Sequence, residues 1–177
     1  MRNVLFSHIS ASLQTVPHAT FSTPLGLCAI AWGDHGLTRF LLPDPERPAG
    51  GQTEADPPDW VRAIIARVQR HLAGEAQDFS DVRYDFSRVP EFVRAVLKAT
   101  LTVKSGRTAT YGELAAALGQ PPGASRAVGS ALGINPWPLL IPCHRVVAAS
   151  GNLTGFSGPG GVDTKARLLA LEGAQLL

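Results

Sequence analysis

The residues best suited to chemistry stand together at positions 140–147, whose sequence is LIPCHRVV. Cys143 is followed directly by the base His144 and the permanent cation Arg145, within an otherwise apolar run. A cysteine attacks as its thiolate, which a neighbouring base or positive potential favours by lowering the thiol pKa. The segment therefore predicts a nucleophilic thiol that His144 activates, directly or through a bridging water, with Arg145 as a source of positive potential.

A carboxylate that orients the histidine would complete a relay of nucleophile, base and orienting group. Glu172 is the candidate, because the last expected helix must pack against the apolar residues 139–142. Taken singly, the three residues have simpler explanations: a small buried hydrophobe, a hydrogen-bonded core histidine and a solvated helix end. Their occurrence together, behind two short helices, favours the relay.

The composition narrows the class of protein. The chain has 177 residues, 45% of them hydrophobic, which is typical of a globular protein with one or two domains. Two cysteines, and no paired Cys or His at metal-ligand spacing, predict a reducing compartment (the cytoplasm) and no metal. No apolar run approaches the roughly 18 residues of a membrane span, and the first residues do not open a secretory signal. Basic residues outnumber acidic ones only after residue 89, so the second half is expected to meet a polyanion.

Residues 1–85 predict a small α/β module without chemistry of its own. The apolar runs 27–32 and 37–42 flank a Gly-Asp-His-Gly turn, which indicates a β-hairpin. Asp59 is expected to cap an amphipathic helix that ends at Gly74. The apolar stripe of that helix is formed by Trp60, Ile64, Val68 and Leu72. The histidines of this module are scattered, and each is expected to be a surface or packing residue: His8, His18, His35 and His71.

The second half carries denser signals. A helix is expected over 91–103, and Thr110 with Glu113 forms a T-x-x-E capping box that starts a further helix to about Leu118. After a Gly/Pro turn, Ser125 is expected to cap a helix over 126–132, which completes a helix-turn-helix. The small residues of that helix suit close approach to a nucleic-acid groove or to a protein core, and the pattern alone does not separate the two.

Two further elements are expected behind the helix-turn-helix. Residues 146–156 alternate around Ser150-Gly151 as in a β-hairpin, which would form a wing. A final helix is expected over 165–172.

From about residue 79 to residue 174 the chain resembles the O6-alkylguanine-DNA alkyltransferases. The matching segments are TYGELA at 110–115, RAVGSAL at 126–132, Asn135-Pro136, IPCHRVV at 141–147, GFSG at 155–158 and LEG at 171–173. The first half is less similar, mainly at Thr23-Pro24-Leu25-Gly26. The resemblance implies an α/β (α+β) fold. A ribonuclease H-like sheet-and-helix domain at 1–85 would precede a mostly helical winged helix-turn-helix domain at 86–177, which would bind DNA and carry the catalytic residues.

The resemblance also implies a reaction. An O6-alkylguanine, with O4-methylthymine as a further candidate, would be flipped out of DNA and would give its alkyl group irreversibly to Cys143, once per molecule. His144 and Glu172 would keep Cys143 a thiolate through water, and Asn135 would hold the turn into the active-site strand. The protein would act as a monomer without a cofactor, in the minor groove of DNA and with little sequence preference. The alternatives are a lesion sensor, which would lack the reactive cysteine present here, and a cysteine hydrolase.

The remaining site residues are also implied by the resemblance. Tyr111 would crowd the target phosphate, and Arg126 would fill the vacated base stack. The DNA-binding helix would contribute Ala127, Ser130 and Ala131. The alkylguanine pocket would be lined by Tyr111, Pro138, Val146, Phe156, Ser157 and Gly158. Backbone carbonyls of Cys143 and Val146 would accept from the guanine amino group, and the Ser157 N–H would donate to O6.

Overall fold

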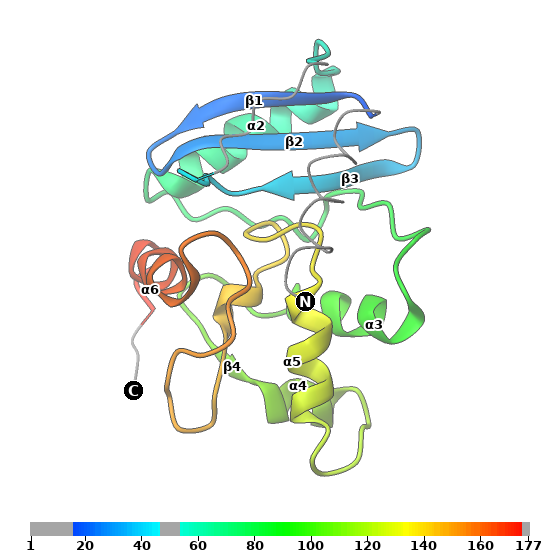
Figure 1. The fold of residues 1–177 in the computed structure, drawn as a ribbon, viewed down its shortest axis with the longest axis vertical. Coiled ribbons are helices and arrows are strands. Elements are labelled where there is room, and N and C mark those ends of the chain that lie inside the picture. The colour runs from blue at the N-terminus through cyan, green and yellow to red at the C-terminus, as the bar shows by residue number, and fades with distance from the viewer. Residues whose placement is uncertain (1–15, 47–53, 175–177) are drawn as a thin grey trace.

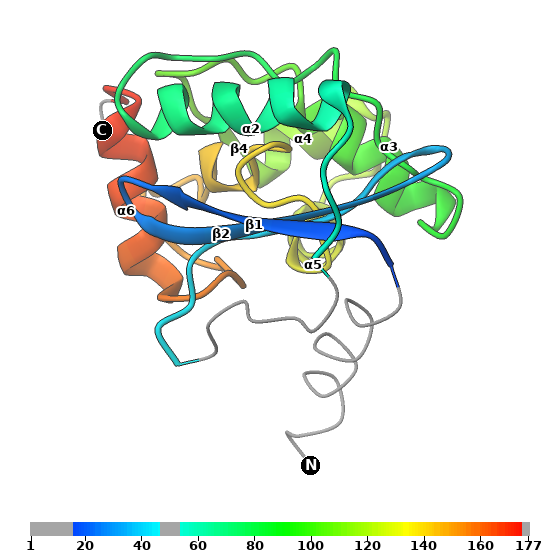
Figure 2. The same ribbon diagram turned by 90° about the horizontal axis from the view of Figure 1, so that it is seen from above.

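The computed structural model describes residues 16–46 and 54–174, so the expectation for His8 lies outside the described residues. The first half forms a three-stranded antiparallel sheet in the order β1 (His18–Thr23), β2 (Gly26–Gly33) and β3 (Gly36–Leu41) (Figure 1). Helix α2 (Asp59–Leu72) lies across one face of this sheet (Figure 2). The predicted hairpin is confirmed as β2 and β3. Strand β1 was not predicted, because its sequence HATFST is mostly polar and lacks an apolar run.

Helix α2 buries one stripe against the sheet. Its buried residues are Val61, Ile64, Val68, His71 and Leu72. The predicted cap is wrong, because the helix begins at Asp59 itself, after Pro58, and no side chain caps it. The Asp59 carboxylate instead accepts a hydrogen bond from the Arg62 guanidinium at 3.3 Å. The chain leaves the helix through Gly74, whose φ of 100° lies in the left-handed region that favours glycine.

The second half is mainly helical. Its helices are α3 (Glu91–Thr100), α4 (Tyr111–Ala117), α5 (Ser125–Gly133) and α6 (Gly161–Leu171), with a single-turn 3-10 helix η1 (Cys143–Arg145). The capping box is confirmed: the Glu113 N–H donates to the Thr110 hydroxyl at 3.1 Å, and the Thr110 N–H donates to the Glu113 carboxylate at 2.6 Å. The predicted Ser125 cap is wrong, because Ser125 is the first residue of α5 and its side chain makes no cap. The two-domain α/β class expected from the sequence is confirmed.

The predicted wing is wrong. Among the described residues, only Val146–Val147 of this region forms a strand, β5, and it pairs in parallel with β4 (Ala109–Thr110). The rest of the expected hairpin is a loop, because its backbone is bound by side chains rather than by a second strand. The Lys165 ammonium donates to the Val146 and Thr154 carbonyls at 2.5 and 2.9 Å, and the Tyr111 hydroxyl donates to the Thr154 carbonyl at 3.1 Å.

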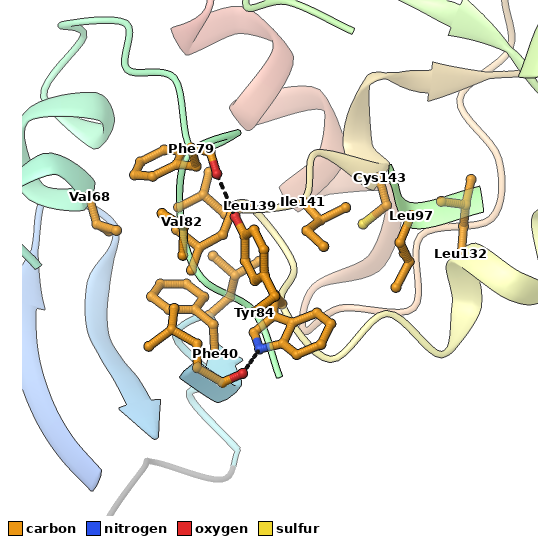
Figure 3. Packing of buried hydrophobic residues seen from close by; sticks show 14 of the residues in the cluster. Phe40, Val68, Phe79, Val82, Tyr84, Leu97, Leu132, Leu139, Ile141 and Cys143 are labelled. Carbon is orange, nitrogen blue, oxygen red and sulfur yellow. Dashed lines mark hydrogen bonds between the residues drawn. The ribbon is translucent and has the colours of Figure 1, made fainter. Parts of the chain in front are cut away.

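The two halves share one buried cluster at the outer edge of β3, the edge that does not pair with β2. The Phe40 N–H donates to the Pro136 carbonyl at 2.9 Å, and the Trp137 indole N–H donates to the Leu37 carbonyl at 3.1 Å. Trp137 is fully buried, with ring centroids 5.1 Å from Tyr84 and 5.2 Å from Phe86. Figure 3 shows Tyr84 within this cluster, where its hydroxyl donates to the Phe79 carbonyl. The segment that leads to Cys143 is therefore anchored on the sheet. No helix of the described chain is long and apolar enough to cross a membrane.

Substitution of Trp137 by Phe is expected to lower the free energy of unfolding by about 1–3 kcal/mol. The change removes buried volume and one of the two donors to the Leu37 carbonyl, which keeps only the Asp85 N–H at 2.9 Å. Urea denaturation measures it, with Leu27→Ala as the control because Leu27 is 40% exposed and should change stability by less than about 0.5 kcal/mol. Equal stability of the two variants would contradict the anchoring role.

Candidate active site

Cys143 is the first residue of η1 and belongs to the same buried cluster as Leu97 and Ile141 (Figure 3). It is 9% exposed, and its N–H donates to the Ile141 carbonyl at 2.8 Å. The approach to it is a tight buried turn in which Leu139 has a φ of 76°, an unusual value for a residue other than glycine. The thiol is thus held on rigid backbone at the edge of the core.

Asn135 fastens this turn. Its amide nitrogen donates to the Ile141 carbonyl at 2.9 Å, and its amide oxygen accepts from the Trp137 N–H at 2.9 Å. The Asn135 side chain also interacts with the Cys143 thiol and favours its ionised form. The residue therefore has the position that its expected role requires.

His144 and Glu172 lie in contact. The His144 Nε2 is 2.8 Å from the Glu172 Oε1, and both side chains are buried, with 0% and 2% exposure. A carboxylate can only accept, so Nε2 carries the proton and Nδ1 carries the lone pair. The buried His144 Nδ1 has no hydrogen-bond partner among the described residues. His144 is therefore oriented as a base, with Nδ1 as the atom that can take a proton.

Arg145 has a different task from the one expected. Its guanidinium donates to both oxygens of Glu172, from Nε at 2.9 Å and from Nη2 at 2.8 Å, and Nη1 donates to the Val103 carbonyl at 2.6 Å. Its charge therefore neutralises the buried carboxylate. The prediction that Arg145 supplies positive potential to the thiol is wrong, because its charge is neutralised by the Glu172 carboxylate.

The cation near the thiol is Lys165, which the sequence analysis did not single out. Lys165 is fully buried on α6, and its positive charge favours the ionised form of Cys143. Its Nζ also lies 5.8 Å from the centre of the Tyr111 ring. The signal was present, since Lys165 lies three and four residues before the buried Leu168 and Leu169 and so falls on the apolar face of α6.

His71 was also missed: it was expected to be a surface or packing residue, and it instead contacts the Glu172 carboxylate. The His71 Nε2 is 2.9 Å from the Glu172 Oε1, across 101 residues of sequence. Its place on the buried stripe of α2, three residues after Val68, was the available signal. Of the other described histidines, His18 is buried and contacts the Val16 carbonyl, whereas His35 is exposed.

The site holds the thiol and the imidazole uncharged at rest. Burial raises the pKa of Cys143, against the smaller lowering by Asn135 and Lys165. Burial lowers the pKa of His144, against the raising effect of Glu172. Burial alone would raise the pKa of Glu172, but the hydrogen bonds from His144, His71 and Arg145 outweigh it and hold that pKa well below its usual range. These shifts favour a thiol beside a neutral imidazole and an ionised carboxylate in the DNA-free protein, and the activation of Cys143 as a thiolate stays a prediction.

The expected DNA-binding residues lie mostly on one exposed side of α5. Arg126, Ala127 and Ser130 are exposed there. The assignment of Ala131 to the DNA-binding set is wrong, because Ala131 is only 4% exposed and packs in the core. The half-buried Tyr111 ring lies beside the same helix, since a Cβ added at Gly129 would meet it at 3.6 Å.

Of the expected pocket residues, Phe156, Ser157 and Gly158 belong to the loop after β5 and Val146 to β5 itself, whereas Pro138 lies between α5 and η1. Val146 is buried, Pro138 and Phe156 are half-buried, and Ser157 is exposed. The Phe156 ring lies so close to Gly158 that a Cβ there would approach it to 2.5 Å. Gly158 therefore allows the aromatic ring to fold over the loop. Within residues 16–46 and 54–174, no three His, Cys, Asp or Glu side chains are arranged to hold a metal ion.

Comparison with known proteins identifies relatives of this arrangement. The profile of the family described as "6-O-methylguanine DNA methyltransferase, DNA binding domain" matches residues 91–174. The methylated-DNA–protein-cysteine methyltransferase of Mycolicibacterium paratuberculosis is 39% identical, over 89% of this chain and 92% of that protein. The protein of the same name from Methanothermobacter thermautotrophicus is 36% identical, over 86% of this chain and 83% of its own. The crystal structure of Mycobacterium tuberculosis OGT in complex with DNA has a TM-score of 0.75 and 37% identity, covering 89% of this chain and 93% of that one.

Substitution of Glu172 by Gln is expected to cost about 3–5 kcal/mol of folding stability at pH 7, because the Arg145 guanidinium would lose its buried counter-charge. The folded pKa of Glu172 lies far below the ordinary value of 4.5, so its contribution is present above that pH and is lost as the pH falls below it. The stability difference between wild type and Glu172→Gln should therefore shrink below about pH 4.5.

Urea denaturation between pH 7 and about pH 3.5 measures this difference. Wild type and Glu172→Gln must be compared at each pH, because the wild-type curve contains other acid-sensitive groups. The Lys104 contact lowers the pKa of Asp78, so the stabilisation from Asp78 is also lost in acid, in both proteins. The exposed Glu91 offers a control, since Glu91→Gln should change stability at pH 7 by less than about 0.5 kcal/mol. A pH-independent difference would contradict the ionised state of Glu172.

Proposed function

The chain belongs to the family of methylated-DNA–protein-cysteine methyltransferases, and we propose that Cys143 is the residue to which it transfers the alkyl group of O6-alkylguanine. The enzyme repairs DNA by direct reversal of alkylation damage. One observation carries the assignment to Cys143: the thiol precedes a buried histidine whose Nε2 is held by Glu172, which leaves Nδ1 to take a proton. The other cysteine, Cys28, lies buried in β2 without such a relay, and burial raises its pKa to about 11.

The proposed step is an in-line displacement. The Cys143 proton passes through a water to the His144 Nδ1, and the sulfur attacks the alkyl carbon as the bond from that carbon to O6 breaks. The electron pair of the broken bond stays with the guanine, which takes up a proton and is restored. The thioether left on Cys143 has no ready leaving group, so each molecule acts once. The permanent charge of Glu172 stabilises the imidazolium that forms during the transfer.

An uncharged Cys143 thiol and an uncharged His144 imidazole at rest suit a nucleophile that can be used only once. A buried thiol with a raised pKa is a poor target for unspecific oxidants and alkylating agents. Activation then depends on the alkylated base, whose departing oxygen needs a donor as negative charge develops on it. We assign that donor to the N–H of Ser157. The pocket is completed by Tyr111, Pro138, Val146, Phe156 and Gly158.

The exposed side of α5 is the proposed DNA contact. Ala127 and Ser130 are small, and the Ser130 hydroxyl donates its proton to the Arg126 carbonyl at 3.1 Å, which leaves only its lone pairs to accept a hydrogen bond. A helix face of this kind can approach the narrow minor groove closely and gives little sequence preference. Arg126, exposed in the first turn, is placed to fill the gap left by a flipped base. Tyr111, beside α5, would crowd the target phosphate.

Three broader assignments belong to the same proposal. The chain divides near residue 85 into the sheet domain and the DNA-binding domain. It acts as a monomer without a cofactor, as the resemblance implies, and few large hydrophobic residues of the described chain are exposed: Leu27, Ile134, Val162 and Leu171. It works in the cytoplasm, where the free Cys28 and Cys143 stay reduced. A lesion sensor that only binds the damaged base is not favoured, because it has no use for the relay around Cys143.

Incubation with a duplex that contains one O6-methylguanine is expected to add a single methyl group to the protein. Intact-mass measurement and peptide mapping should place it on Cys143, with the guanine restored and no more than one equivalent of lesion repaired per protein. Cys143→Ser should lose transfer by at least about 10³-fold, because a serine hydroxyl is hardly ionised at neutral pH, while Cys28→Ser should react as the wild type does. Unmodified wild-type protein bound to the lesion would favour the sensor, and multiple turnovers would favour a hydrolase.

Substitution of Arg126 by Ala is expected to slow repair in duplex DNA by about 10–100-fold, because the flipped state loses the side chain that fills the stack. The reaction with free O6-benzylguanine needs no flipping and should change less than about 2-fold. Single-turnover rates on both substrates measure the split, and Arg70→Ala, which removes an exposed charge from α2, is the control. Equal losses on the two substrates would contradict the role of Arg126.

A further inference from the structure

We propose that His71, in the last turn of α2, is a positioning residue for the transfer at Cys143, because it donates a hydrogen bond that holds the Glu172 carboxylate against His144. The inference rests on the proposed function and extends it: the orienting group of the relay is itself oriented by the sheet domain. The contact joins α2 to the end of α6, and both side chains are 2% exposed.

The hydrogen bonds fix which nitrogen of His71 carries the proton. The backbone N–H of Gln77 can only donate, and it lies 3.0 Å from the His71 Nδ1. Nδ1 must therefore present its lone pair, so the proton of the neutral ring is on Nε2. Nε2 in turn lies 2.9 Å from the Glu172 Oε1, which can only accept. His71 is thus held as a neutral donor to the carboxylate.

The ring is held on its other sides as well. Gly74, with a φ of 100°, reverses the chain after α2 so that Gln77 returns to the histidine. Phe79 packs edge-on against the His71 ring, with centroids 5.6 Å apart and an interplanar angle of 64°. The imidazole cannot rotate without losing these contacts, so its Nε2 is a fixed point for the carboxylate.

Three donors converge on one oxygen of Glu172. His71 and His144 each donate through Nε2, and Arg145 donates through Nη2, all at 2.8 to 2.9 Å from Oε1. Arg145 alone would fix the plane of the carboxylate through its two contacts. His71 adds a donor from the opposite domain, which fixes Oε1 where His144 needs it and moderates its basicity. The groups that face His144 are therefore Glu172, Arg145 and His71, while Lys165 acts on Cys143.

Two substitutions separate the donor from the structural contact. In His71→Gln the amide nitrogen can replace Nε2 and donate to Glu172. In His71→Asn the shorter amide can replace Nδ1 as the acceptor for Gln77, but no donor reaches Glu172. If His71 positions the relay, His71→Asn should react with free O6-benzylguanine about 10-fold more slowly than the wild type, and His71→Gln should stay within about 2-fold of it. In His71→Asn the Glu172 carboxylate loses one hydrogen-bond donor and stabilises the His144 imidazolium more, which raises the His144 pKa. The inflection of rate against pH should therefore move to higher pH in His71→Asn only.

Single-turnover rates across pH and thermal unfolding test the pair, with the exposed His35→Asn as the control that should leave both unchanged. A wild-type rate for His71→Asn, or an equal loss in both variants, would overturn the proposal. The tautomer offers a test without any His71 variant: long-range ¹H–¹⁵N spectra of the wild type at pH 7 should show Nε2 protonated and Nδ1 bare, and the reverse would overturn it. If wild-type protein gains no benzyl group on Cys143, the proposed function fails instead, which separates the two outcomes.

Discussion

A buried carboxylate with a permanent charge is the constraint on which the site depends. Removing Glu172 from water is costly unless its charge is neutralised and its lone pairs are filled. Arg145 supplies the charge, and His144 and His71 supply further donors. These partners come from η1 and α2, whereas Glu172 follows α6, so the carboxylate is satisfied only when the three elements meet. The same contacts that satisfy it also fix the His144 Nε2 proton and free Nδ1 as a base. Stability and chemistry are therefore set by one cluster.

The division of charge inside the site follows from this constraint. Of the two buried cations, Arg145 is committed to Glu172, while Lys165 binds the Val146 and Thr154 carbonyls and lies near the thiol. Neither cation offsets the desolvation of Cys143 enough to ionise it at rest, since its pKa is still raised by burial. The positive potential of Lys165 acts on a thiolate only when a proton has left. In the proposed reaction, the thiol therefore becomes a strong nucleophile only when His144 takes its proton.

Local signals in the sequence predicted the parts of the fold that short-range chemistry decides. The Thr110–Glu113 capping box and the hairpin of β2 and β3 needed only neighbouring residues, and both are present. Prediction failed where a side chain far away in the sequence binds the backbone groups that a second strand would have bound. Residues after Val147 alternate like a strand, but Lys165 and Tyr111 bind the Thr154 carbonyl and hold a loop there. The relay of His144 and Glu172 followed from packing arguments and resemblance, whereas His71 depends on a contact across 101 residues that spacing does not reveal.

The sheet domain holds the active site at two points. The outer edge of β3 binds the Pro136 carbonyl and the Trp137 indole, which fixes the turn into Cys143. Helix α2, on one face of the same sheet, places His71 on the carboxylate that orients His144. The turn before Cys143 is bound to the edge of β3, and the Glu172 carboxylate is bound to the end of α2. A movement of the sheet domain would therefore act on the nucleophile and on the orienting group through two separate contacts. Cys143 and His144 are neighbours in η1, so the packing between the two halves sets the position of the carboxylate that orients His144 rather than the spacing of the thiol and its base.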